Sequence, residues 1–361
     1  MADIPKTALY QQHLELNARM VEFAGWMMPV VYSSIVEEHL AVRSHAGLFD
    51  IGHMARLNFT GTDALPLLEK VCTNSIATMK ENQVRYSLVC NQHGCILDDV
   101  LVYSWSDSFS MVVNASNRSK ILNWLELHKA GMQVEVQDRT FETAMIAVQG
   151  PKAIDMVKTL TEADPSTLKY YYATHTKCMG QPCVISRTGY TGEDGVELVI
   201  DNAHATALWD ELETLGAKPA GLGCRDTLRL EAAMPLYGYE LTEAIDPLQA
   251  GLNWAVKFDK GAFIGKTAIL ERQQQGHFPV RIGIELEGKR PAREGCAIHH
   301  QGIKIGTVTS GTFTPTLQKS IAMGYVSKEY ASAGTELQID IRGTPATSKV
   351  VKMPFYTRKK D

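Results

Sequence analysis

Two segments of the chain share one pattern, and this internal repeat constrains the possible folds more than any other feature. Residues 57–71 read LNFTGTDALPLLEKV, and residues 146–160 read IAVQGPKAIDMVKTL. In each, a strand-like run ends at a glycine (Gly61 or Gly150), and apolar residues then recur at helical spacing. Further strands, a second helix and a closing strand follow in both cases. We therefore predict an α+β fold with two pseudo-repeated units, whose equivalent hairpins face a shared cleft.

The sequence changes character near residue 280. Beyond it, turns rich in glycine and serine separate short strand-like runs, which read VRIGIELEG, GIKIGTVTSG, KSIAMGYV, TELQIDIRG and KVVKMPFY. This pattern predicts an all-β barrel or sandwich. The 361 residues thus divide into a first α+β unit at 1–138, a second at 139–275 and an all-β domain at 276–361. We expect the first two units to be intertwined.

Two aspartates, Asp98 and Asp99, interrupt the apolar run GCILDDVLVY at residues 94–103. The turn NQHG joins this run to the strand-like VRYSLVC, which predicts a hairpin. Successive side chains of a strand point to opposite faces, so a sheet with one covered face would bury one of the two carboxylates. A buried carboxylate is costly unless it is paired, and a functional acid is one explanation. A solvated pair at the start of the strand is the alternative, and this stretch alone favours neither.

Charge and composition exclude several classes of function. A net charge of −4 provides no basic field for nucleic acid, and no apolar stretch approaches the length of a membrane span. The N-terminus, MADIPKTALYQQH, has neither an apolar signal core nor the character of a transit peptide, so we expect a cytoplasmic protein. The seven cysteines include no CxxC and the eleven histidines no HExxH, so we expect reduced thiols and no metal site.

Two glycine-containing segments are similar to nucleotide-binding loops without matching them. GAFIGKT, residues 261–267, has three residues between its first glycine and the Gly–Lys pair, where a P-loop has four. GLGC, residues 221–224, lacks the third glycine of a dinucleotide fingerprint. We therefore expect no nucleotide site.

Glycine recurs at every third position of RTGYTGEDGVEL, residues 187–198. Such spacing allows the backbone to approach a ligand closely, which favours a binding loop. The alternative interpretation is a long hairpin tip whose acidic side chains are solvated. The segment RDTLRLEA places Arg225 and Arg229 one helical turn apart. Its alternative is a surface helix with ion pairs to Asp226 and Glu231.

These segments and several others resemble the glycine cleavage system T-proteins, a family of tetrahydrofolate-dependent aminomethyltransferases. The resemblance runs from about residue 8 to residue 355 and rests on MVEFAGWMMPVVYSS, FDIGHM, GCILDDVLVY, AVQGPKA, RTGYTGEDGVEL, GLGCRDTLRLEAAMPLYG, FIGK, TSGTFTPTLQKSIAMGYV and KMPF. Two residues beside the expected site depart from the family pattern. Cys95 stands where a second glycine is usual before the Asp pair, and Gly52 stands where a serine is usual before His53. Both can alter turn geometry without removing a functional group.

The resemblance implies three domains in a cloverleaf, with folate held in a central channel. It also implies an enzyme with a protein partner, the H-protein, which carries an aminomethyl group on its lipoyl arm. The T-protein transfers the methylene to tetrahydrofolate as co-substrate. The products are 5,10-methylenetetrahydrofolate, ammonia and the reduced lipoyl arm, and no metal takes part.

The resemblance further assigns roles to single residues. It places Asp98 opposite the folate as the catalytic acid, which steers protons and stabilises a developing cation, with Asp99 as its structural neighbour. Glu197 would hold the pterin, because a carboxylate matches the two-donor edge formed by the 2-amino group and N3–H. Arg225 matches a family arginine that contacts ligand. The remaining candidate contacts are Met54, Tyr86, Asn114, Tyr190 and, near the C-terminus, Arg358.

Two other functions stay open beside the aminomethyltransferase. One is a non-catalytic folate-binding protein that supports iron–sulfur assembly. Such relatives carry a Lys-Gly-Cys-Tyr-type motif and typically lack the Asp pair, whereas this chain reads DKGAFIGK and has the pair. The other is a stand-alone folate-dependent demethylase of the same fold, although the terminal motifs favour a T-protein.

The C-terminal tail TRKKD, residues 357–361, is the sequence candidate for a cationic surface that docks an acidic H-protein. Lys352 lies just before it. A solvated basic tail that needs no partner is the alternative.

Overall fold

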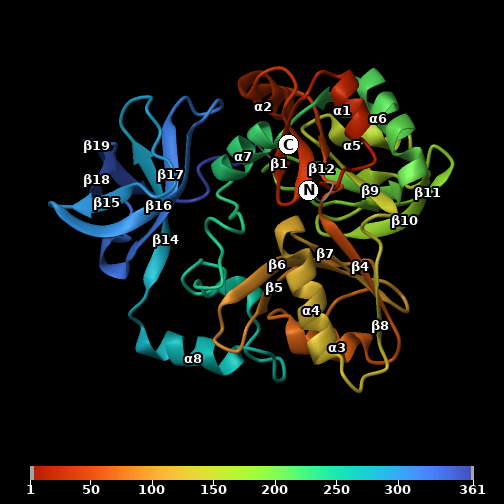
Figure 1. Cartoon of the computed structure of the whole chain (residues 1–361), viewed down its shortest axis with the longest axis horizontal. Coiled ribbons are helices and arrows are strands. Elements are labelled where there is room, and N and C mark those ends of the chain that lie inside the picture. The colour runs from red at the N-terminus through yellow and green to blue at the C-terminus, as the bar shows by residue number, and fades with distance from the viewer. Residues whose placement is uncertain (1–3, 359–361) are drawn as a thin grey trace.

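The computed structural model describes residues 4–358 and consists of three bodies around a common centre (Figure 1). Two bodies are sheets covered by helices, and the third is a barrel formed by the C-terminal part of the chain. Within the described residues, no helix combines the length and the apolar character needed to cross a membrane.

The first body is a five-stranded sheet with the strand order β5-β6-β7-β4-β8. Its strands are β4 (Ala55–Thr60), β5 (Val84–Cys90), β6 (Ile96–Ser104), β7 (Phe109–Val113) and β8 (Glu135–Asp138). Helices α3 (Ala64–Val71) and α4 (Arg118–His128) cover one face. Apolar residues at helical spacing, such as Leu68 and Ile121, pack there against Leu57 and Val102 of the sheet.

The second body is a six-stranded sheet with the strand order β10-β11-β12-β9-β3-β13. Its strands are β3 (Gly47–Asp50), β9 (Thr143–Gln149), β10 (Ala173–Cys178), β11 (Gln181–Ser186), β12 (Gly195–Asp201) and β13 (Lys218–Pro219). The associated helices are α1 (Tyr10–Glu15), α5 (Ala153–Lys158) and α6 (Ala205–Thr214). Trp209 of α6 is fully buried in the core between this sheet and its helices.

The predicted repeat is present in the two sheets. Strands β4 to β7 and strands β9 to β12 have the same order, with β3 inserted beside β9 in the second sheet. The shared glycine follows from the geometry of the strand-to-helix turn. Gly61 has a φ of +101° and Gly150 a φ of +136°, and a Cβ on Gly150 would lie 2.5 Å from the carbonyl oxygen of His45.

The two bodies exchange segments of the chain, so the predicted boundaries 1–138 and 139–275 do not separate the two sheets. Strand β3, from the first 50 residues, pairs antiparallel with β9. Conversely, α8 (Lys266–Gln275) packs on the first body, where Ile269 contacts the cluster around Leu88 and Ile96. Strand partners that lie far apart in sequence cannot be identified from local patterns.

The third body is a closed six-stranded barrel with the order β14-β17-β16-β15-β18-β19. Its strands are β14 (Pro279–Leu286), β15 (Ala297–His300), β16 (Ile303–Phe313), β17 (Ser320–Ser327), β18 (Glu336–Ile341) and β19 (Thr344–Val351). Alternate residues such as Ile284, Val308 and Ile339 fill its interior. The pairing of β14 with β19 closes the sheet and removes its exposed edges. The prediction of an all-β barrel or sandwich is therefore confirmed as a barrel.

Helix α7 (Leu222–Glu231) lies between the barrel and the second body and contacts β16, β17, β2 and α2 (Figure 1). The hairpin of β1 (Arg19–Phe23) and β2 (Trp26–Val31) and the helix α2 (Ile35–Ser44) complete this junction. The short 3-10 helices are η1 (Ala115–Asn117), η2 (Pro165–Thr167), η3 (Asn202–His204), η4 (Asn253–Ala255) and η5 (Lys328–Tyr330). Side chains of α7 thereby reach the centre of the molecule.

Candidate functional site

A cavity of about 600 Å³ lies where the three bodies meet. The five-stranded sheet contributes Tyr86 and Asp99 to its wall, and the six-stranded sheet contributes Glu197. Helix α7 contributes Arg225, and the barrel contributes Ser310. The cavity thus lies where the internal repeat places a shared cleft, and its size is typical of small-molecule sites.

The two aspartates of β6 have different surroundings. Asp98 is completely buried. Its Oδ2 accepts a hydrogen bond from the backbone N–H of Asn114 (3.0 Å), and its Oδ1 accepts from the side-chain amides of Asn114 (2.8 Å) and Asn117 (2.5 Å). The Asp98 carboxylate therefore satisfies backbone and side-chain donors at the start of η1, which leads into α4. Asp99 is partly exposed and lines the cavity.

The prediction that Asp98 faces the ligand differs from the structure, in which the described cavity wall includes Asp99 and not Asp98. The reason is that both faces of β6 are covered. Val100 and Val102, on the face of Asp98, pack under α3 and α4. Leu101 and Tyr103, on the face of Asp99, pack in a cluster with residues of the second body. The alternation of side chains was predicted correctly, but the sequence did not show which covered face borders the cavity.

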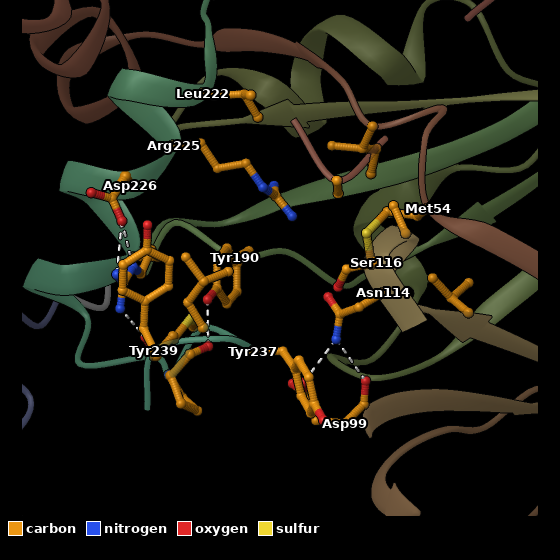
Figure 2. A pocket seen from close by; sticks show the side chains of 18 of the residues that line it. Met54, Asp99, Asn114, Ser116, Tyr190, Leu222, Arg225, Asp226, Tyr237 and Tyr239 are labelled. Carbon is orange, nitrogen blue, oxygen red and sulfur yellow. Dashed lines mark hydrogen bonds and ion pairs between the residues drawn. The ribbon is translucent and has the colours of Figure 1, made fainter. Parts of the chain in front are cut away.

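Asn114 connects the two acids. Its Nδ2 donates to Oδ1 of Asp99 at 2.8 Å (Figure 2). The same Nδ2 donates to Oδ1 of Asp98 at 2.8 Å, and the Tyr86 hydroxyl donates to Oδ2 of Asp99 at 3.2 Å. Burial raises the pKa of both carboxyl groups, and the charge of Asp99 raises the pKa of Asp98 further. The pair therefore retains a proton to a higher pH than an isolated aspartate does.

Glu197 and Arg225 form a second polar group in the cavity. Glu197 is buried, and its Oε2 accepts a hydrogen bond from the Thr188 hydroxyl at 2.5 Å. Burial raises the pKa of Glu197, although Thr188 and the charge of Arg225 oppose this shift. A carboxylate with further acceptor capacity thus faces the cavity beside a cation.

The Arg225 side chain has no fixed anionic partner. It extends from α7 toward the part of the cavity lined by Met54 (Figure 2). Its Nη1 is buried, and the guanidinium group makes neither a hydrogen bond nor an ion pair with the residues that the structure describes. Its carbon Cζ lies 4.7 Å from the centre of the Tyr190 ring. Because unpaired buried donors are rare, Arg225 is well placed to bind an acceptor on a ligand.

The other predicted contacts divide into two groups. Met54, Tyr86, Asn114 and Tyr190 all line the cavity, and the Tyr190 hydroxyl is fixed by the carbonyl oxygen of Pro235. Arg358 is not part of the cavity wall formed by residues 4–358. Its Nη1 lies 3.0 Å from Oδ2 of Asp194, so it holds the tail against the glycine-rich loop at 187–198.

Several cavity residues were not predicted from the sequence. Trp254 is 55% exposed and stacks on Tyr86 with 5.2 Å between ring centres. Tyr237 and Tyr239 belong to the same irregular segment after α7, which has no helical or strand periodicity to mark them. His53 also lines the cavity, and the motif FDIGHM was the signal that could have identified it.

The chemistry of the wall favours an organic ligand that is partly flat and polar at its edge. Tyrosine and tryptophan rings offer stacking surfaces, while Glu197 accepts and Arg225 donates hydrogen bonds. Within residues 4–358, no group of three or more His, Cys, Asp or Glu side chains is arranged to hold a metal ion.

Comparisons with known proteins agree with this architecture. Residues 9–260 match the family model of the GCVT N-terminal domain, and residues 280–357 match that of the glycine cleavage T-protein C-terminal barrel domain. An aminomethyltransferase of Caldanaerobacter subterraneus subsp. tengcongensis is 44% identical, with 99% of this chain and 97% of the relative aligned. One from Moorella thermoacetica is 43% identical over the whole of both chains. The crystal structure of glycine cleavage system aminomethyltransferase T from Bartonella henselae superposes with a TM-score of 0.93 at 34% identity, covering 98% of each chain.

Proposed function

The chain belongs to the glycine cleavage T-protein family, and from this premise we propose that it transfers a methylene group from the aminomethylated lipoyl arm of an H-protein to tetrahydrofolate in the cytoplasm. The products are 5,10-methylenetetrahydrofolate, ammonia and the reduced lipoyl arm. The family and its relatives support an aminomethyltransferase of glycine cleavage. In our proposal, tetrahydrofolate is the co-substrate.

The observation that carries the proposal is that Glu197 and Arg225 both line the central cavity, and that the Arg225 side chain has no hydrogen-bond partner among the described residues. A reduced pterin has a two-donor edge, formed by its 2-amino group and N3–H, with a carbonyl oxygen next to it. Glu197 accepts from the two donors, and Arg225 donates to the carbonyl oxygen. Tyr190, which lies under the Arg225 guanidinium, offers its ring to the bound ligand.

We assign the catalytic role to Asp99, because it is the acid of the pair that reaches the cavity. Tetrahydrofolate supplies the nitrogen atoms that take up the methylene. The Asp99 carboxylate, oriented by Tyr86 and Asn114, stabilises positive charge that develops near it and can receive or return a proton. A raised pKa suits this second task, since the proton is then exchanged closer to neutral pH.

Asp98 has a positioning role in this proposal. It fixes Asn114 by two hydrogen bonds, and Asn114 in turn donates to Asp99. The order along the chain of contacts is therefore Asp98, Asn114, Asp99 and then the cavity. Buried hydrogen-bond networks of this kind hold a functional side chain in one rotamer.

An assay with aminomethylated H-protein and tetrahydrofolate tests the proposal. We expect ammonia and 5,10-methylenetetrahydrofolate to form in equal amounts, and only when both substrates are present. Tight binding of reduced folate without ammonia release would favour the non-catalytic folate-binding alternative. Turnover of an N-methylated amine in the absence of H-protein would favour the demethylase.

A further inference from the structure

His53 is a cavity residue with unused hydrogen-bonding capacity. The side chain lines the cavity, and the residue is only 3% exposed. Neither ring nitrogen makes a hydrogen bond with any described residue, and Nδ1 is buried. Buried polar groups in folded proteins are nearly always paired, so an unpaired imidazole at a cavity wall needs an explanation.

The turn that carries His53 is held rigidly from both sides. The backbone N–H of Gly52 donates to Oδ1 of Asp50 at 2.8 Å. The carbonyl oxygen of Gly52 accepts from Nη1 and Nη2 of Arg56, at 3.1 and 3.2 Å. Asp50 is itself held by Nε2 of His13 at 2.8 Å. This network fixes the position of His53 before any ligand binds, as expected of a binding residue.

The surroundings of the ring determine its protonation state. The Phe23 ring meets it edge to face, with 5.8 Å between ring centres. Burial lowers the pKa of His53 to about 4; the charge of Asp50 opposes this shift, and the charges of Arg225 and Arg56 add to it. The imidazole is therefore neutral at physiological pH, with one nitrogen that donates and one that accepts. His53 and Arg225 both line the cavity, so one bound ligand can contact both side chains.

We propose that His53 is a further folate-binding residue, which hydrogen-bonds the heterocyclic end of the reduced folate beside Arg225. This inference rests on the proposed function, because it takes the pterin as the occupant of this part of the cavity. The bound heterocycle then supplies a partner for Nε2, because Nδ1 is buried and a ligand in the cavity cannot reach it. If His53 served only to pack against Phe23, any planar ring at this position would do equally well.

The test compares His53→Phe with His53→Gln. Phenylalanine keeps a planar ring against Phe23 but has no nitrogen, whereas the glutamine amide can replace Nε2. Titration calorimetry measures the affinity for 5-formyltetrahydrofolate and for 6-methyltetrahydropterin, which lacks the benzoylglutamate part. We expect His53→Phe to weaken both probes about tenfold and His53→Gln to restore most of this loss. His175→Phe, the same substitution outside the cavity wall, should leave both affinities unchanged.

The outcomes distinguish a failure of the proposed function from a failure of the proposed role of His53. A wild-type protein that binds neither probe contradicts the proposed function itself. Wild-type binding with unchanged affinity in His53→Phe overturns the role of His53, and so does an equal loss in the Phe and Gln variants at unchanged melting temperature. A loss for the folate but not for the pterin overturns the placement at the heterocycle. If His53→Phe does not fold, His53→Leu takes its place in the comparison with His53→Gln.

Discussion

At the scale of the residue, the adjacent acids Asp98 and Asp99 differ because successive strand residues face opposite sides of β6. Asp98 accepts three hydrogen bonds from Asn114 and Asn117 and lies away from the described cavity wall. Asp99 reaches the cavity and accepts from Tyr86 and Asn114. The two residues are therefore expected to respond differently to the same substitution.

Asp99→Asn should lower turnover roughly 100-fold and leave the melting temperature nearly unchanged, because an amide keeps the volume but cannot exchange a proton. Asp98→Asn should lower the melting temperature and reduce turnover less, since the new amide opposes the Asn114 and Asn117 donors; we expect a loss of roughly 1–3 kcal/mol. Steady-state kinetics and thermal unfolding of both variants measure this. If Asp98→Asn loses turnover at full stability while Asp99→Asn stays active, the catalytic role belongs to Asp98.

Glu197→Gln should weaken the binding of reduced folate more than it slows turnover. The glutamine amide presents one acceptor and one donor to the two-donor edge of the pterin. One pterin N–H is then left without an acceptor, which costs about 1–3 kcal/mol of binding free energy. Because burial raises the pKa of Glu197, wild-type affinity should begin to fall at a pH above the ordinary glutamate range as the pH is lowered. Calorimetric titrations from pH 7 to pH 5 in both proteins measure these effects. A pH dependence that persists in Glu197→Gln would assign the titrating group elsewhere.

At the scale of the element, the repeated strand–glycine–helix turn depends on close backbone contacts. A Cβ on Gly150 would lie 2.5 Å from the carbonyl oxygen of His45 and 2.6 Å from that of Val42. Both carbonyl oxygens belong to the backbone near the end of α2, so they cannot move away as a flexible side chain would. The turn thus joins the second unit to the N-terminal segment that contributes β3.

Gly150→Ala should therefore destabilise the protein strongly. The positive φ alone costs roughly 1–3 kcal/mol for a residue with a Cβ, and the backbone clash adds to this. Gly131→Ala is the matched control, because Gly131 also has a positive φ (+78°) but nothing within 4 Å of its would-be Cβ. Thermal or denaturant unfolding measures both. Equal losses in the two variants would mean that the contact with the end of α2 contributes nothing.

At the scale of the whole molecule, buried charges connect elements that are far apart in the sequence. Arg43 of α2 pairs with Glu193 of the glycine-rich loop at 2.9 Å and with Glu231 of α7 at 2.8 Å. Its guanidinium carbon lies 3.9 Å from the ring centre of Tyr356, whose hydroxyl donates to Glu193. This cluster ties the tail after the barrel to the second body. Lys359 and Lys360, the tail residues considered for partner docking, lie outside the described residues.

Arg43→Leu should destabilise this junction by about 3–5 kcal/mol, because it removes the cation that the buried Glu193 and Glu231 share, and only Glu231 keeps a contact with His39. Lys158→Met, which removes an exposed ion pair with Asp164, is the control and should leave the melting temperature unchanged. Thermal unfolding and limited proteolysis near residues 355–358 measure the effect. A stable Arg43→Leu protein with an intact tail would mean that apolar packing alone holds the three bodies together.

The features that depend on local chemistry could be predicted from the amino-acid sequence. Strand and helix periodicity predicted the two repeated units and the C-terminal β domain, and the shared Gly61 and Gly150 marked their turns. These patterns reflect steric limits and side-chain alternation within a few neighbouring residues. The segments around Glu197 and Arg225 stood out for the same reason, since their glycine and arginine spacing is visible locally.

Which of these local features lie next to one another depends on how the whole chain packs. Strand β3 pairs with β9 about 100 residues away, and nothing within Gly47–Asp50 specifies that partner. Asp99 rather than Asp98 lines the cavity because the second body covers one face of β6 while α3 and α4 cover the other. His53 and Tyr237 reach the cavity from irregular segments, and Trp254 reaches it from the three-residue helix η4, which is too short to show periodicity. Long-range pairing and burial depend on the packing of the whole chain, so no local pattern records them.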